Sequence, residues 1–413
     1  MSLRVNGGRL AADLAELGTF GRAPGGGINR TSFSAADLQA RQWYLARCAA
    51  AGLTVRIDGI GNMVVSQPGD TGGPAVWSGS HLDAVPDGGA FDGAVGAIAA
   101  LECVRRLAEE GIALSRPVRA VAFTDEEGNY SHLLGSSAMA RGFPAAQWQQ
   151  LTGRDGDRLV DAITAAGWDV SALTATKIDP AEVYAFVELH IEQGPRLAAS
   201  RTDIGAVTSI VGLGGAVAEF GGRADHAGTT PMDARRDPLL AAADLIAALP
   251  GIARSVSEHA VATCGRVDAA PGAANVVPGE VAVTLDYRDP DAAALALLGK
   301  RIAARCAAAA AVRDVSVDWQ PDQQIEPVAL DPRVISVIEA SARRLELSVR
   351  RMPSGAGHDA QNMATLAPAA MIFVPSRDGR SHSPAEHTEA ADVENGANVL
   401  LATLTELATQ GLT

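Results

Sequence analysis

Apolar and polar positions follow two different patterns along the chain. Over residues 35–52 apolar side chains recur at helical spacing, and Gly52 ends this predicted helix. Apolar runs typical of buried strands follow at residues 54–58, 62–67, 75–80, 117–123 and 183–189, and a second helical pattern lies at residues 93–110. Strands that alternate with helices indicate βαβ units, so this part of the chain is predicted to form a largely parallel sheet.

A different order of elements begins after residue 204. The pattern there predicts, in chain order, a strand, a helix, two strands, a helix and a strand, at residues 216–222, 237–249, 259–267, 280–287, 291–311 and 312–319. A helix at 332–345, a strand at 369–374 and a long helix at 389–408 then resume the first pattern. The sequence therefore predicts an α/β domain of residues 1–208 and 323–413, interrupted by an α+β domain at residues 209–322.

Composition narrows the class of protein. A hydrophobic content of 47% with only 4% aromatic residues indicates an aliphatic core, which suits helices packed on sheets. No run of about 18 apolar residues is free of charge or Gly/Pro breaks, which argues against a membrane span. The net charge of −14 disfavours nucleic acid and anionic membranes as partners. The first ten residues lack an apolar signal core and the four cysteines lack CxxC spacing, so we expect a cytoplasmic protein without disulfides.

Several groups that can bind metals or move protons lie just after predicted strands or at the start of a predicted helix. They are His81, Asp92, the pair Glu126 and Glu127, His190 and His382. Because the carboxyl ends of parallel strands meet at one edge of a sheet, we expect these side chains to converge in one crevice.

Three imidazoles and two carboxylates suit borderline divalent ions, with Zn²⁺ expected first and Mn²⁺, Co²⁺ or Ni²⁺ as alternatives. These ligands suffice for two ions roughly 3.5–4 Å apart if Asp92 bridges them. Asp83, two residues after His81, is placed to hold the other N–H of that imidazole. Neighbouring side chains on an extended segment point in opposite directions, so one of Glu126 and Glu127 should bind metal. The other should move protons while a metal-held hydroxide attacks a carbonyl.

Seven motifs occur in order along the chain: GSHLD (79–83), GAFDG (89–93), EEG (126–128), ELHIEQGP (188–195), DHAGTTPM (225–232), SGAGHDA (354–360) and SHSP (381–384). Together they resemble the hydantoinase/carbamoylase amidases, a branch of the di-zinc aminoacylase and carboxypeptidase family. The resemblance covers residues 9–408. It implies a zinc-exopeptidase-like catalytic domain with an inserted ferredoxin-like domain that serves as lid and dimer interface.

The resemblance also implies a role for each matching residue. The ligands of two metal ions would be His81, Asp92 as the bridge, Glu127, His190 and His382. Glu126 would be the general acid and base, a distinction that spacing alone leaves open.

The inserted domain is implied to complete the site. In a homodimer, His226 would reach the neighbouring subunit's site and stabilise the oxyanion; the alternative is a capping role in its Gly/Thr-rich turn. The implied substrate contacts are Gln193, Asn275, Arg288 and the loop Gly355, Ala356 and Gly357. Arg288 would pair with a substrate carboxylate, with an ion pair to Asp286 or Asp289 as the alternative.

The implied reaction is hydrolysis of the carbamoyl C–N bond of an N-carbamoyl-L-amino acid or a related ureido acid. The family pattern has a small residue, Arg and Phe where this chain has Asn129, Tyr130 and Ser131, so the substrate's shape is open. Allantoate and N-acyl or aryl-acetyl amino-acid conjugates stay as alternative substrates, and a scaffold without activity stays as an alternative class. The other histidines considered, His132, His259 and His387, are expected to be structural.

Overall fold

The computed structural model describes residues 3–70 and 72–412. The chain divides into two compact units. Unit 1 comprises the described residues of Met1–Thr208, Leu330–Met352 and Ala356–Thr413, and unit 2 comprises Ser209–Ala329 and Pro353–Gly355.

Unit 1 is built on one sheet with the strand order β1-β2-β4-β3-β5-β15-β6, and β14 also pairs with β6. The strands are β1 Thr54–Ile57, β2 Met63–Ser66, β3 Ala75–His81, β4 Val118–Phe123, β5 Val183–Ile191, β6 Ile204–Ile210, β14 Val349–Ser354 and β15 Ala369–Val374. The four central strands are parallel, as the βαβ pattern predicts. The outer pairs are antiparallel. The sheet is therefore mixed. The strands β1 and β2 are antiparallel because the turn between them, at residues 58–62, is too short for the crossover that a parallel pair needs.

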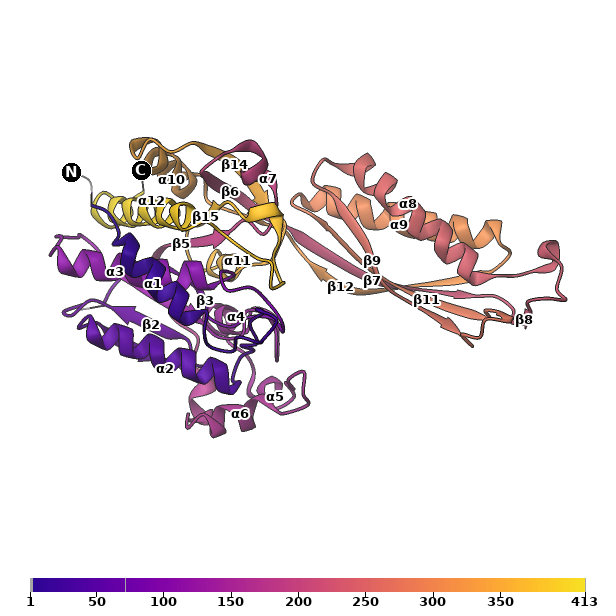
Figure 1. The fold of residues 1–413 in the computed structure, drawn as a ribbon, viewed down its shortest axis with the longest axis horizontal. Coiled ribbons are helices and arrows are strands. Elements are labelled where there is room, and N and C mark those ends of the chain that lie inside the picture. Colours follow the sequence, from indigo (N-terminus) through magenta and orange to yellow (C-terminus); the bar gives the residue numbers. More distant parts are fainter. Residues whose placement is uncertain (1–2, 71, 413) are drawn as a thin grey trace. The chain divides into compact units, whose positions relative to one another are not determined.

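Helices bury the central strands of unit 1. The helices of unit 1 are α1 Gly7–Leu17, α2 Ala35–Ala50, α3 Ala94–Glu109, α4 Leu134–Arg141, α5 Ala145–Trp148, α6 Leu159–Ala165, α7 Arg196–Ser200, α10 Pro332–Arg344, α11 Asp359–Met363 and α12 Ala390–Thr409, with 3₁₀ turns at Val170–Ala175, Pro180–Glu182 and Arg377–Gly379. Every residue of β3, β4 and β15 is buried. The helices α3 and α12 pack against β3 and β5, and α10 lies beside α12 (Figure 1). The predicted ligands lie at or beyond the carboxyl ends of these buried strands.

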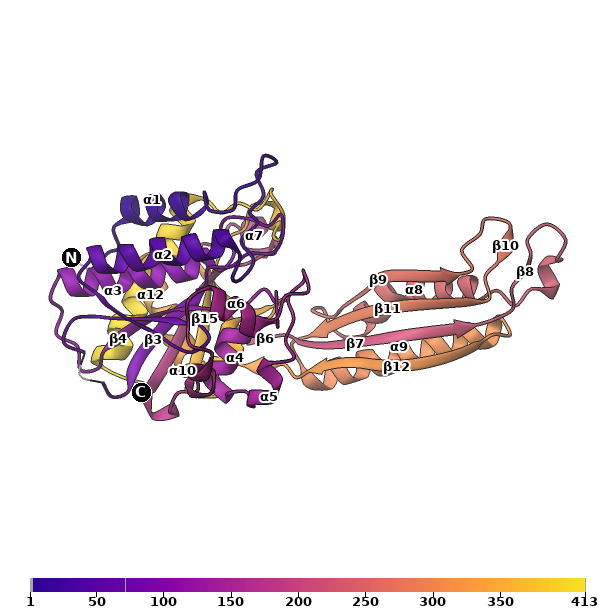
Figure 2. The ribbon, with the colours of Figure 1, turned by 90° about the horizontal axis from the view of Figure 1, so that it is seen from below.

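Unit 2 has the element order β-α-β-β-α-β. Its main elements are β7 Gly212–Gly221, α8 Pro238–Val256, β9 Val261–Ala270, β11 Glu280–Asp289, α9 Ala292–Val312 and β12 Ser316–Ile325. The short strands β8 Asp225–His226 and β10 Val276–Val277 form a separate pair, β13 is Val328–Ala329, and a 3₁₀ turn covers Met232–Ala234. The sheet order β12-β7-β11-β9 is wholly antiparallel, and α8 and α9 pack together on it (Figure 2). This is a ferredoxin-like arrangement.

Helix α8 is the one described helix that is long and apolar enough to cross a membrane. It nevertheless carries Asp244 and Arg254, and Pro250 lies inside it. Its residues Leu245 and Leu249 are buried in the hydrophobic core of unit 2. The core helix of a folded domain passes the same test of length and composition, so this one helix is weak evidence for a membrane span.

Candidate metal centre

Neighbouring elements of unit 1 bring the predicted ligands to one place. His81 is the last residue of β3, and His190 is the penultimate residue of the adjacent parallel strand β5. Asp92 lies just before α3, whose N-cap is Gly93 with a φ of +63°. A Cβ on Gly93 would lie 2.3 Å from the His81 ring, so only glycine allows this approach. His382 comes from the loop between β15 and α12.

Asp92 is the centre of the cluster. Its Oδ1 lies 3.1 Å from Nε2 of His190 and 3.7 Å from Nε2 of His81, and its Oδ2 lies 3.2 Å from Nε2 of His382. Glu127 Oε2 is 3.5 Å from the same His382 nitrogen. Two groups therefore share Asp92: one with His81 and His190, the other with Glu127 and His382. In each group the ligand atoms lie within 4.8 Å of one another, as two ions bridged by one carboxylate require.

Backbone carbonyls set the tautomers of two imidazoles. His81 Nδ1 lies 3.0 Å from the Asp83 carbonyl oxygen, and His190 Nδ1 lies 2.9 Å from that of Ile191. Since a carbonyl only accepts hydrogen bonds, Nδ1 carries a hydrogen in both rings, and Nε2 is the nitrogen that faces Asp92. The sequence had suggested the Asp83 carboxylate for this role, but its Oδ1 stands 3.7 Å from His81 Nδ1.

The Asp83 carboxylate instead holds the backbone that carries the paired glutamates. Its Oδ2 accepts the N–H of Glu127 at 3.1 Å, and its Oδ1 accepts the N–H of Glu126 at 3.4 Å. The chain turns at Asp125, whose φ is +56°, so this segment is not extended. Both glutamates therefore reach the cluster, and Glu126 Oε2 lies 3.6 Å from His81 Nε2. The expectation that they point in opposite directions was wrong for this reason.

Burial and crowding perturb every group of the cluster. Burial, and next the charge of Glu127, raise the pKa of Glu126 well above its usual value. Burial and then Asp92 raise the pKa of Glu127 to about 8. Burial alone would raise the pKa of Asp92, but hydrogen bonds from His190 and His382 outweigh it and hold that pKa well below the usual value.

The same contacts act on the histidines in return. Burial lowers the pKa of His190, yet its bond to Asp92 brings the value to about 9, and the bond to Asp92 raises the pKa of His382 to about 9. Among the described residues, Glu127 Oε1 is buried without a hydrogen-bond partner. The cluster thus combines crowded buried carboxylates, a buried carboxylate oxygen without a hydrogen-bond partner, and three imidazole nitrogens. This set of donor atoms fits divalent cations.

Gln193, predicted to contact substrate, is engaged with the cluster itself. Its φ is +58°, and its Nε2 donates to Asp92 Oδ2 at 2.7 Å and to Ser381 Oγ at 3.3 Å. It therefore supports the central carboxylate.

Three supporting residues were missed by the sequence reasoning. Glu188 accepts bonds from the Ser80 hydroxyl and the Ala360 N–H, and the His358 ring lies 4.5 Å from that of His190. Glu386 accepts backbone N–H groups of the loop that carries Asp92. For Glu188 a signal existed, because a carboxylate inside an apolar strand run is costly unless it is paired. Glu386 had no such signal.

The predicted residues of unit 2 fall in two places. His226 and the residue after Asn275 are paired across β8 and β10. His226 Nδ1 accepts from the N–H groups of Gly228 and Thr229, at 3.0 and 3.2 Å. The capping role considered as an alternative is therefore present. Because Nδ1 is an acceptor, Nε2 must carry the hydrogen, so the exposed edge of this ring is a donor.

Arg288 of β11 forms the alternative ion pair, with Nε and Nη2 on Asp286 at 3.0 and 3.1 Å. Its Nη1 donates to the Gly355 carbonyl at 3.3 Å, which places the guanidinium beside the predicted glycine loop. Gly355 belongs to unit 2, while Ala356 and Gly357 belong to unit 1.

The segment that departs from the family pattern is absorbed by local packing. Tyr130 is 8% exposed, lies in a small hydrophobic cluster with its ring 5.8 Å from that of Phe33, and donates its hydroxyl to Asp157. The Asn129 amide donates to the Ser32 carbonyl at 3.1 Å. Tyr130 therefore belongs to this hydrophobic cluster, and its bulk gives no reason to expect a different substrate.

Comparison with known proteins places this arrangement in a family. The model of the peptidase family M20/M25/M40 matches residues 77–406. An N-carbamoyl-L-amino-acid amidohydrolase of Paenarthrobacter aurescens is 38% identical over 95% of this chain and 96% of its own length. An allantoate amidohydrolase of Escherichia coli is 35% identical over 95% and 96%. The crystal structure of a hydantoinase/carbamoylase family amidase from Burkholderia multivorans superimposes with a TM-score of 0.91 at 34% identity, over 99% of both chains. This chain therefore belongs to the hydantoinase/carbamoylase amidases of the peptidase family M20/M25/M40.

Proposed function

We propose that this hydrolase uses two divalent metal ions to cleave the carbamoyl C–N bond of an N-carbamoyl-L-amino acid or a closely related ureido acid. The products would be the amino acid, ammonia and carbon dioxide. The observation that carries the proposal is the sharing of Asp92 between two three-ligand groups. A structural site would be closed, whereas each ion here would have three protein ligands and retain open positions.

The proposed holders of the ions are His81, Asp92 and His190 for one, and Asp92, Glu127 and His382 for the other. Zn²⁺ fits this donor set, as do Mn²⁺, Co²⁺ and Ni²⁺. When bound, the ions would supply Lewis-acid activation of a water and of the scissile carbonyl.

Glu126 would move the protons. It is 5% exposed, and its Oε2 lies 3.6 Å from Nε2 of His81, so its carboxylate is beside the proposed metal ligands and could take a proton from a water there. It would then give that proton to the leaving nitrogen. Asp83 would keep the Glu126 carboxylate in place by holding its backbone N–H. Water attack and nitrogen departure thus depend on one carboxylate with a fixed backbone.

Recognition of the amino-acid part would fall mainly to unit 2. Arg288 would pair with the substrate's carboxylate, which must compete with Asp286 for the guanidinium. Asn275, Gln193 and the backbone at Gly355, Ala356 and Gly357 would make further polar contacts. We further propose a homodimer in which unit 2 serves as lid and dimer interface.

The donor edge of His226 would act in trans in that homodimer, on the oxyanion in the partner's site. The four cysteines are free, which fits a reducing compartment such as the cytoplasm.

Ammonia release from a substrate panel tests the reaction. The purified chain, loaded with Zn²⁺, Mn²⁺, Co²⁺ or Ni²⁺ in turn, is given N-carbamoyl-L-amino acids, allantoate and N-acetyl-L-amino acids. The proposal predicts ammonia and free amino acid in equal amounts from the first group, and loss of activity with a chelator. Turnover of the N-acetyl compounds alone would replace the carbamoyl reaction with N-acyl hydrolysis. Allantoate is the second candidate, favoured by the Escherichia coli relative.

Glu126→Gln tests the proton transfer. The amide cannot accept the proton of water, so kcat should fall at least 10²-fold while the metal content stays at two ions. Full activity with metal still bound would contradict the assigned role.

Mixing two inactive variants tests the action of His226 in trans. In a heterodimer of Glu126→Gln and His226→Ala, one site would combine an intact Glu126 with the partner's intact His226. An equal mixture should then regain about a quarter of the wild-type activity, because half of the dimers carry one complete site. If His226 acts within its own subunit, the mixture stays inactive.

A further inference from the structure

Glu386 joins two distant segments that carry predicted metal ligands. Its Oε1 accepts the N–H groups of Phe91 and Asp92, at 2.9 and 3.0 Å. Its Oε2 accepts the hydroxyl of Ser381 at 2.8 Å, directly before His382 in the chain. The side chain is 5% exposed, so water does not compete strongly for these bonds.

We infer that Glu386 is a positioning residue of the metal centre, which holds Asp92 and His382 at the separation needed to bind a common ion without binding that ion itself. The inference rests on the proposed metal centre.

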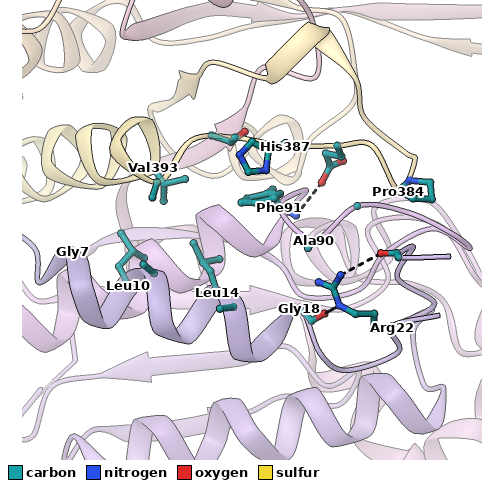
Figure 3. A pocket seen from close by; sticks show the side chains of 17 residues that line it. Gly7, Leu10, Leu14, Gly18, Arg22, Ala90, Phe91, Pro384, His387 and Val393 are labelled. Carbon is teal, nitrogen blue, oxygen red and sulfur yellow. Dashed lines mark hydrogen bonds between the residues drawn. The ribbon is translucent and has the colours of Figure 1, made fainter. Parts of the chain in front are cut away.

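The loop of Asp92 lacks dense packing on one side. A cavity of about 450 Å³ lies there, lined in part by Leu10 and Leu14 of α1 and by Phe91, with Glu386 in its wall (Figure 3). The Phe91 ring packs in an edge-to-face arrangement with His387, with ring centroids 5.3 Å apart. The cavity leaves fewer packing contacts on this side of the loop, so the hydrogen bonds of Glu386 contribute more to holding it.

Glu386 also lies near the start of α3. The first turn of α3 has no acidic residue, and its N-cap, Gly93, has no side chain. Glu386 accepts the N–H groups of the two residues before this N-cap, so it places a carboxylate where the helix dipole favours negative charge. Gly89 makes room for it, since a Cβ there would lie 2.0 Å from Glu386 Oε1.

Ser381 extends the contact to the second segment. Its Oγ lies 2.8 Å from Glu386 Oε2 and 3.1 Å from Asp92 Oδ2, and its single proton can serve only one carboxylate at a time. Gln193 donates to Asp92 Oδ2 at 2.7 Å, so Asp92 has its own donor while the Ser381 proton is on Glu386. Glu386 therefore fixes the residue beside His382 as well as the backbone of Asp92.

Titration of the metal-free protein with Co²⁺, followed by its visible absorption against a competing chelator, tests the inference without any turnover. Glu386→Ala should weaken Co²⁺ binding about 10–100-fold and change the absorption bands. Glu386→Gln should bind Co²⁺ near the wild-type affinity, because its amide oxygen still accepts both N–H groups and its NH₂ can donate to Ser381. Gly89→Ala, which displaces the carboxylate, should reproduce the Glu386→Ala defect.

Asp289→Ala is the matched control. Asp289 is a buried carboxylate of unit 2 that accepts one backbone N–H, from Asp291, where Glu386 accepts two, and like Glu386 it accepts one serine hydroxyl, from Ser257. Its loss should lower thermal stability without changing the Co²⁺ affinity. If Glu386→Ala behaves in the same way as this control, Glu386 is only structural and the inference is wrong.

Two other outcomes are equally decisive. If Glu386→Ala does not fold, the other two variants decide. Weakened Co²⁺ binding by Gly89→Ala together with wild-type Co²⁺ affinity of Glu386→Gln supports the inference, and wild-type Co²⁺ affinity of both variants overturns it. If the wild-type chain itself binds no Co²⁺, the proposed metal centre fails first, and the inference fails with it.

Discussion

Replacement of Asp83 by alanine should separate catalysis from stability. Two effects on stability oppose each other in Asp83→Ala. The N–H groups of Glu126 and Glu127 lose their acceptor, at a cost of about 1–3 kcal/mol each. Burial, however, raises the pKa of Asp83 to about 6, above the value of 3.8 expected in the unfolded chain.

The sign of the second effect follows from that shift. A folded-state pKa above the unfolded one means that stability falls as the pH rises from about 4 to about 6, and the ionised carboxylate costs the folded state about 3 kcal/mol at neutral pH. The variant loses this cost together with the two hydrogen bonds. The free energy of unfolding should therefore change by less than about 3 kcal/mol. Activity has no such compensation, because both glutamates lose their anchor, and kcat should fall about 10–100-fold.

Urea unfolding of the metal-free protein and ammonia release by the metal-loaded enzyme measure the two quantities. Asp58→Ala is a suitable control, because burial raises the pKa of Asp58 to about 6 as well, and its carboxylate also accepts two backbone N–H groups, those of Ile60 and Asn62. It should lose comparable stability and keep its kcat. The reasoning is refuted if Asp83→Ala retains full kcat, or if the two variants lose activity equally.

Three further changes have defined outcomes. Tyr130→Phe should cost about 1 kcal/mol in urea unfolding through the lost bond to Asp157 and leave kcat unchanged; a large loss of kcat would return Tyr130 to the substrate site. Gly93→Ala places a Cβ 2.3 Å from the His81 ring at a φ of +63°, so it should lower stability by about 1–3 kcal/mol and weaken Co²⁺ binding; normal binding would contradict the close approach. Burial raises the folded-state pKa of Asp58 to about 6, so the wild-type protein should lose about 3 kcal/mol of stability between pH 4 and pH 7, and Asp58→Asn should abolish this loss. Equal pH profiles of the unfolding free energy for the wild type and the variant would argue against this pKa shift.

The parts of the site that could be predicted from the sequence follow from strand geometry. The apolar runs that form β3 and β5 end at His81 and just after His190, and parallel strands align their carboxyl ends. The proximity of His81 and His190 could therefore be predicted from these two strands alone. The four central parallel strands follow from the same alternation of strands and helices.

Other features depend on contacts that no local pattern encodes. Helix α1 begins with two glycines, which disfavour helices, and it is held by the Asn6 cap and by Arg9 pairing with the distant Glu102. The positive φ of Asp125 turns both glutamates inward, although the preceding residues read as a strand. Glu386 lies in a loop without periodicity, and its partners are far away in the sequence. Such residues acquire their role only from tertiary structure.

The position of β15 has a consequence for how the chain matures. This strand lies between β5 and β6 in the middle of the sheet, yet it is made after the whole of unit 2. A chain still on the ribosome therefore has two apolar strands with no partner between them, and exposed strand edges of this kind invite association with other chains. His382, a proposed metal ligand, emerges later still, so the two proposed ligand groups can assemble only after it has been made. The edge of β5 that β15 covers in the finished sheet therefore stays without its partner until the whole of unit 2 has been made.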